Sequence, residues 1–145
     1  MSLRKPVAEL EVELALLGDD PGPHVIYLPP GDISVEAIDL YLQSARRFLP
    51  VSWTGLPRII NKEQILWLRV NRSGLDSEAE VTTIRNATIL ELADRSRLEG
   101  YVRQPPDHSR LSDVLNDRVE FFLRLDKAES LYFVNKAHIR FAVPQ

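Results

Sequence analysis

The chain of 145 residues contains no cysteine. This absence excludes disulfide bonds, thiolate catalysis and zinc sites built on cysteine ligands. The three histidines, His24, His108 and His138, lack the spacing that is typical of metal ligands, so we expect neither a metal nor a cofactor. A glycine-rich phosphate loop and a nucleophile-elbow serine are also missing. We therefore predict a protein that is not an enzyme.

Basic residues are not in excess. The 21 acidic residues outnumber the 18 basic ones, which gives a net charge of −3. The broad positive footprint of a nucleic-acid-binding domain is therefore missing. Apolar runs are too short to span a membrane, and the first six residues lack the apolar core of a signal peptide. These absences predict a cytoplasmic protein that contacts no membrane.

What the chain does contain is an internal repeat. Residues 120–143 resemble residues 47–70, and the matching residues lie 74 positions apart. The matches are Phe48-Leu49 with Phe122-Leu123, Asn61-Lys62 with Asn135-Lys136, Ile65 with Ile139, and Asp39 with Asp113. A repeat of this kind predicts two similar halves, residues 1–72 and 81–145, joined by a linker at 73–80. We expect at least the two leucines and the two isoleucines among these residues to be buried.

Both halves are predicted to have the element order β-β-α-β-β-β. The first half has strands at residues 7–17, 24–28, 48–53, 58–60 and 64–70 and a helix at 34–43 that Ser34 can cap. The second half has strands at 88–93, 98–103, 121–125, 131–134 and 138–143 and a helix at 109–116. Residues 7–17 also fit one face of a helix, but the alternation of apolar residues favours a strand. Turns are expected at residues 54–57 and 126–130.

Five short strands leave unpaired edges unless the sheet closes. The expected fold is therefore mainly β, with two small β-barrels in tandem, each with one short helix, related by an internal pseudo-two-fold axis. Exposed edges and the duplication also predict that the halves, or whole chains, associate through those edges.

Two segments carry a resemblance to a known family. Residues 88–102 (TILELADRSRLEGYV) and 134–144 (VNKAHIRFAVP) resemble the two motifs of the Sm-like fold, particularly its bacterial RNA-chaperone branch, Hfq. The resemblance implies Sm/SH3-like barrels with RNA binding at a barrel rim. Its uridine-binding Lys and His correspond to Lys136 and His138, which Ala137 separates here. A tandem arrangement of this kind is also similar to bacterial domains of unknown function, which implies no activity.

The candidate ligand-binding residues are the matched polar pairs and two arginines. Asn61 with Lys62, and Asn135 with Lys136, could present an amide and an ammonium group to an anionic ligand. The alternative is that each Asn accepts a left-handed backbone conformation in a tight turn and that each Lys is solvated. Arg95 and Arg97 lie in a segment that resembles the signature of PilZ cyclic-dinucleotide receptors, although the segment is one residue longer than that signature. With Arg103 and Arg110 they could form a basic face.

We therefore expect a non-enzymatic binding or scaffolding module that acts through protein–protein contacts, with a protein partner or a second copy. The alternative is RNA or nucleotide binding, including cyclic dinucleotides, at a barrel rim. The acidic balance of the chain makes nucleic acid the less favoured partner.

Overall fold

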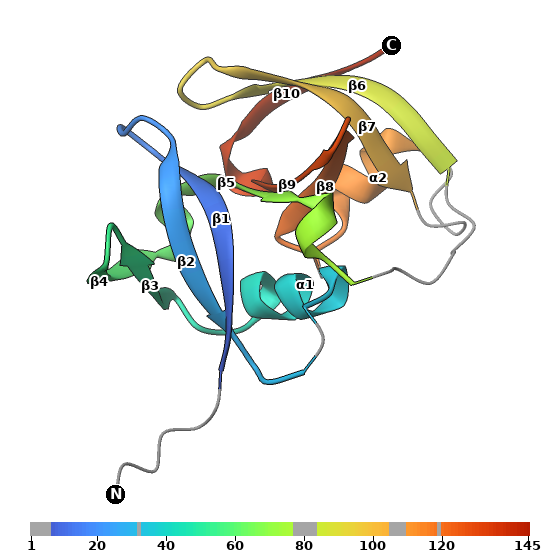
Figure 1. Ribbon diagram of the computed structural model, residues 1–145. Helices are drawn as coiled ribbons and strands as arrows, with labels where there is room; N and C mark the ends of the chain where they lie inside the picture. Colours follow the sequence, from blue (N-terminus) through green and yellow to red (C-terminus); the bar gives the residue numbers. More distant parts are fainter. Residues whose placement is uncertain (1–6, 32, 77–83, 105–109, 119) are drawn as a thin grey trace, which may run out of the picture.

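A computed structural model describes residues 7–31, 33–76, 84–104, 110–118 and 120–145 (Figure 1). The first half comprises β1 (Ala8–Leu16), β2 (Gly22–Leu28), α1 (Val35–Gln43), β3 (Phe48–Trp53), β4 (Leu56–Asn61), η1 (Lys62–Gln64) and β5 (Ile65–Asn71). The second half follows η2 (Arg72–Gly74) and comprises β6 (Ile84–Leu92), β7 (Arg97–Gln104), α2 (Leu111–Asn116), β8 (Phe122–Lys127), β9 (Ser130–Asn135), η3 (Lys136–His138) and β10 (Ile139–Pro144). The protein is mainly β, as predicted.

The local sequence explains most of these elements. In β1 the apolar residues at alternate positions are buried, so the strand interpretation of this segment is correct and the helical one is wrong. Helix α1 begins after Ser34, whose Oγ accepts from the amide of Ala37 at 3.2 Å, as expected. Helix α2 is shorter, and Arg110 precedes it without a side-chain cap. Ser109, the predicted start, lies outside the described residues.

The β3–β4 and β8–β9 turns are shorter than predicted. The strands continue to Trp53 and Lys127 and resume at Leu56 and Ser130, so each turn has two residues. Thr54 and Gly55 both have positive φ, 51° and 80°, which is the conformation that closes a two-residue hairpin. Because both turns are short, residues 56 and 57 of the first predicted turn, and residues 126, 127 and 130 of the second, belong to strands.

The ten strands of the described residues form one antiparallel sheet in the order β10-β6-β7-β8-β9-β5-β1-β2-β3-β4. Within this order, the first half reads β5-β1-β2-β3-β4 and the second half reads β10-β6-β7-β8-β9, so the corresponding strands have the same neighbours. The pairing of β5 with β1 and that of β10 with β6 each contain one register shift at the corresponding place.

The halves meet where β5 pairs with β9, at the centre of Figure 1. We call this pairing the junction. In the order of elements β9 corresponds to β4, whereas β5 corresponds to β10. The junction therefore joins non-equivalent strands, head to tail. A two-fold relation would pair equivalent strands, so the expected pseudo-two-fold axis is not the relation observed.

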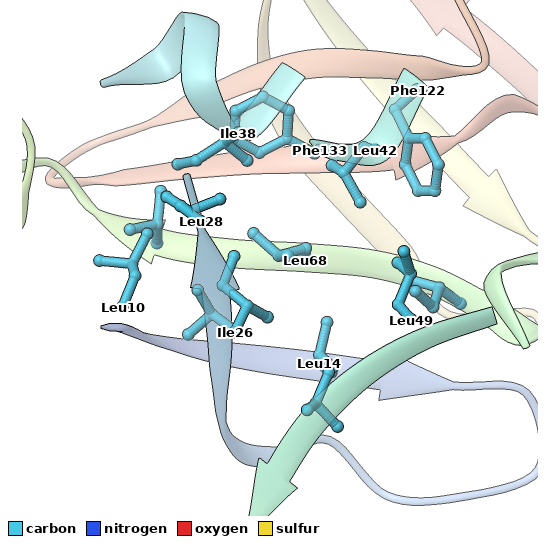
Figure 2. Close-up of a cluster of buried hydrophobic side chains, with 14 of the residues drawn as sticks. Leu10, Leu14, Ile26, Leu28, Ile38, Leu42, Leu49, Leu68, Phe122 and Phe133 are labelled. Carbon is cyan, nitrogen blue, oxygen red and sulfur yellow. The ribbon is translucent and has the colours of Figure 1, made fainter. Parts of the chain in front are cut away.

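The hydrophobic interior consists of two clusters that cross the junction. The first cluster lies in the first half but also contains Phe122, Leu131 and Phe133 from the second half (Figure 2). The second cluster lies in the second half but contains Ala15, Leu66 and Trp67 from the first half. Each half therefore completes the core of the other.

Three of the four residues predicted to be buried are buried, and Ile139 is only partly buried. Leu49, Leu123, Ile65 and Phe122 are buried, and Ile139 packs partly buried against the second cluster. Phe48, although it matches the buried Phe122 in the repeat, is exposed. The corresponding residue Phe122 packs into the hydrophobic cluster of the first half. Phe48 lies in β3, next to the terminal strand β4, and in the described residues no further strand follows β4 in the sheet.

The predicted linker at 73–80 begins inside an ordered segment. Residues 72–74 form η2, Leu75 packs against the first cluster, and the amide of Asp76 donates to the carbonyl of Ile33 at 2.8 Å. Residues 77–80 lie outside the described residues. Among the described ranges, neither helix has the length and apolar character needed to cross a membrane.

Candidate functional site

The two matched asparagines start short helical turns. Asn61 Oδ1 accepts from the amide of Glu63 at 3.1 Å, and Asn135 Oδ1 accepts from the amide of Ala137 at 3.0 Å. Their φ angles are −69° and −67°, so neither adopts the left-handed conformation that was expected. The asparagines recur because each caps the 3₁₀ turn that leads into the last strand of its half.

The two matched lysines bind helix ends. Lys62 Nζ donates to the carbonyls of Leu42 at 3.0 Å and Ser44 at 2.5 Å, where α1 ends. Lys136 Nζ donates to the carbonyls of Val114 at 2.6 Å and Asp117 at 3.2 Å, where α2 ends. Burial lowers the pKa of both lysines from the usual value for this side chain. A cation at a helix C-terminus satisfies orphan carbonyls and complements the helix dipole, so both ammonium groups are already engaged.

Two of the four arginines of the predicted basic face are paired with carboxylates. Arg97 Nε lies 3.2 Å from Glu91 Oε1, and Arg103 Nε lies 2.6 Å from Asp126 Oδ2. Both carboxylates are buried, and each also meets a second arginine, Arg140 or Arg72 respectively. Arg95 lies in the β6–β7 turn with a φ of 69°. Arg97 and Arg103 therefore pair buried acids within the sheet, whereas Arg95 and Arg110 are exposed.

A cleft of about 410 Å³ lies between the two halves, and we call it the junction cleft. It brings together two of the predicted residues, Lys62 and Asn135. Asn135 Nδ2 also donates across the junction to the carbonyl of Ile65 at 3.0 Å. The residues that line the cleft are Ser44, Ala45, Arg46, Arg47, Lys62, Glu63, Phe121, Phe122, Asn135 and Ala137.

Sequence reasoning missed Arg46, Arg47 and Phe121 as lining residues of the junction cleft. Both arginines and the Phe121 ring are exposed, and Arg47 Nη2 lies 3.5 Å from Glu63 Oε2. The amide of Phe121 donates to Gln43 Oε1 at 2.6 Å, which ties the second half to the end of α1. The only sequence signal was the Arg-Arg pair before Phe48, which has no counterpart before Phe122.

A smaller cavity of about 260 Å³ surrounds His24. His24 Nδ1 donates to the carbonyl of Gly22 at 2.9 Å, so Nε2 is free to accept from Arg58 Nη1 at 3.3 Å. Burial, helped by the Arg58 charge, lowers the pKa of His24, although its bond to Gly22 acts in the opposite direction. Arg58 also stacks on the Trp53 ring at 4.8 Å. This cluster holds a neutral histidine as part of the structure.

The terminal strand β4 and its neighbour β3 expose four large apolar side chains, Phe48, Trp53, Leu56 and Ile59. We call this group the β4 edge surface. Within the described residues, β4 pairs with β3 alone, so its other edge is open. Exposed apolar side chains along an unpaired strand are typical of a contact site.

Comparison with protein-family models, with curated proteins and with solved structures finds no significant match. The described residues contain no group of three or more side chains that could together hold a metal ion. The candidate sites are therefore the β4 edge surface and the junction cleft.

Proposed function

We propose that the protein is a non-enzymatic binding or scaffolding module that acts through protein–protein contacts at the β4 edge surface. The observation that carries the proposal is the exposure of four large apolar side chains beside an open strand edge. The open edge offers backbone donors and acceptors to an added strand, and the apolar side chains select what binds there. Pro57 is the one residue of β4 that lacks a backbone donor, so it shortens this ladder without removing it.

We also propose that the halves are two Sm/SH3-like small barrels in tandem. The support is the shared strand order and the shared position of the register shift in the two halves.

Selection from a displayed library of extended peptides tests the proposed function. The full chain is the bait, and the variant Ile59→Lys is used for counter-selection. Leu40→Lys is the matched control, because Leu40 is exposed to the same degree, 73% against 74%, but lies on α1. We expect peptides with alternating apolar residues that bind the wild type and Leu40→Lys but not Ile59→Lys. Failure to enrich any peptide, or equal binding to all three proteins, contradicts the proposal.

The junction cleft favours a second candidate function, the binding of RNA or a nucleotide at a barrel rim. Arg46 and Arg47 could meet phosphate, and the exposed ring of Phe121 could stack on a base. This function ranks second because the Lys62 ammonium is engaged by carbonyls and because Glu63 places a carboxylate in the same cleft. Oligonucleotide titration, described in the Discussion, tests it.

A further inference from the structure

The two ends of the sheet are complementary. In the part of the chain that the structure describes, the sheet ends at β4 on one side and at β10 on the other. In the element order, β10 corresponds to β5 and β4 corresponds to β9, and β5 and β9 are the strands that pair at the junction. A second molecule could therefore present its β10 to β4 in the manner that β5 already pairs with β9. The junction supplies the template for this contact.

The exposed residues at the β4 end are counterparts of residues that the junction buries. Phe122 and Phe133 are 2% and 0% exposed, because they enter the core of the first half. Their counterparts 74 positions earlier are Phe48 and Ile59, which are 53% and 74% exposed. The β4 end thus has the apolar side chains of a junction without the neighbour that covers them.

The β10 end shows the same pattern in reverse. Trp67 of β5 is 7% exposed, because it packs into the core of the second half. Its counterpart in β10 is Phe141, which is 41% exposed, and Val143 beside it is exposed as well. Both partners of a junction-like contact are therefore present on one molecule, at opposite ends of the sheet.

At both ends of the sheet, β4 and β10 have backbone hydrogen-bonding groups that point outward. The amide of Lys62 donates to the carbonyl of Arg47, directly before β3, and that of Gln145 donates to the carbonyl of Ala87 in β6. Because hydrogen-bonding residues alternate in antiparallel strands, the amides of Ile59 and Ala142 face away from the sheet. The junction pairs Leu68 with Phe133, and the same register places Ala142 opposite Ile59.

Two prolines weaken this contact. The junction pairs Val70 with Leu131, and the corresponding pair is Pro144 opposite Pro57. Neither proline has an amide hydrogen to donate, so two ladder bonds are lost at this point. The Arg72–Asp126 ion pair of 2.5 Å that supports the junction also has no equivalent, because Ser52 takes the place of Asp126. We expect reversible association that depends on protein concentration.

We propose that a second copy of this chain docks head to tail, with its β10 against the β4 edge surface. This inference rests on the proposed function and names the partner. Because the contact joins non-equivalent strands, repetition gives a closed ring or an open polymer rather than a two-fold dimer.

Sedimentation velocity of the full chain over a wide concentration range tests the proposal. We expect the wild type and the control Leu40→Lys to increase in mass, and Ile59→Lys and Phe141→Lys each to remain monomeric. An equimolar mixture of the two edge variants should give a dimer, because one keeps an intact β10 and the other an intact β4. A monomeric wild type, assembly of either edge variant alone, or a monomeric mixture would overturn the proposal.

Cysteine trapping tests the register in the same assembly. The chain has no cysteine, so only introduced thiols can cross-link. Hydrogen-bonded antiparallel pairs have Cα atoms about 5.5 Å apart, within the disulfide range. Mixed Ile59→Cys and Ala142→Cys proteins should therefore form a covalent dimer on mild oxidation, and mixed Leu40→Cys and Ala142→Cys proteins should not. Equal cross-linking of both mixtures contradicts the register.

The two proposals fail in different ways. If the wild type stays monomeric but selected peptides bind it and not Ile59→Lys, the proposal of self-association is contradicted and the proposed function is retained. If the wild type stays monomeric and no peptide is selected, both the self-association and the proposed function are contradicted.

Discussion

The ammonium of Lys62 donates to the carbonyl oxygen of Leu42 at 3.0 Å, across the end of α1. Lys136 does the same at the end of α2. Replacing either lysine with methionine keeps the length of the side chain but leaves part-buried carbonyls without a charged donor. We expect Lys136→Met to lower the free energy of unfolding by about 1–3 kcal/mol in urea titration.

Lys127→Met is the matched control, because Lys127 is exposed at the end of β8. It should unfold at the urea concentration of the wild type. If Lys136→Met were also as stable as the wild type, the ammonium would be available for another role, and the ligand-binding interpretation would regain support.

Gly100 is predicted to be the least replaceable glycine. A Cβ atom at this position would lie 2.5 Å from the carbonyl oxygen of Asp126, where β7 passes β8. We expect Gly100→Ala to cost about 1–3 kcal/mol, since the strands must separate. Gly22→Ala has open space around the added atom and serves as the control. Similar thermal unfolding of the two variants would contradict this packing.

His24 should make the fold sensitive to mild acid. Burial lowers its pKa below the usual 6.5. The unfolded chain therefore binds a proton that the folded chain does not, and stability is retained above pH 6.5 and lost as the pH falls toward the folded pKa. We expect the free energy of unfolding of His24→Gln to fall less steeply below pH 6.5 than that of the wild type. Urea titrations at several pH values measure the free energy of unfolding of both proteins. If it fell equally with pH in the wild type and in His24→Gln, His24 would accept a proton as readily in the folded state as in the unfolded state.

Nucleic acid is predicted to bind weakly. The chain has more acidic than basic residues, and the candidate Arg97 is paired with Glu91. Titration with labelled U-rich and A-rich oligonucleotides at near-physiological salt should show no micromolar binding. Micromolar binding that is lost in both Arg46→Ala and Phe121→Ala, and kept in Arg95→Ala, would instead establish the junction cleft as a nucleic-acid site.

The order of elements could be predicted from the sequence because it depends on local signals. Alternating apolar residues mark β1, Ser34 marks the start of α1, and Asn61 and Asn135 mark the same point in each half. The role of the lysines could not be predicted, because Lys62 contacts carbonyls about 20 residues away in the sequence. Periodicity carries no information about such contacts.

The candidate site was harder to predict for a related reason. Phe48-Leu49 and Phe122-Leu123 are identical in sequence, yet Phe48 is exposed and Phe122 is buried. The difference arises because Phe122 packs into the hydrophobic cluster of the first half, whereas Phe48 lies near the end of the sheet. The β4 edge surface and the junction cleft both depend on this arrangement, so they become visible only once the strand order is known.

The central claim is that the β4 edge surface is a contact site, and amide hydrogen exchange at Ile59 tests it most directly. The measurement compares the full chain at low and high concentration, with Gly18 in the β1–β2 turn as the reference amide. The account predicts that exchange at Ile59 and Ala142 slows as concentration rises, while exchange at Gly18 does not change. Fast exchange at Ile59 at every concentration, and also in the presence of every selected peptide, would contradict the account.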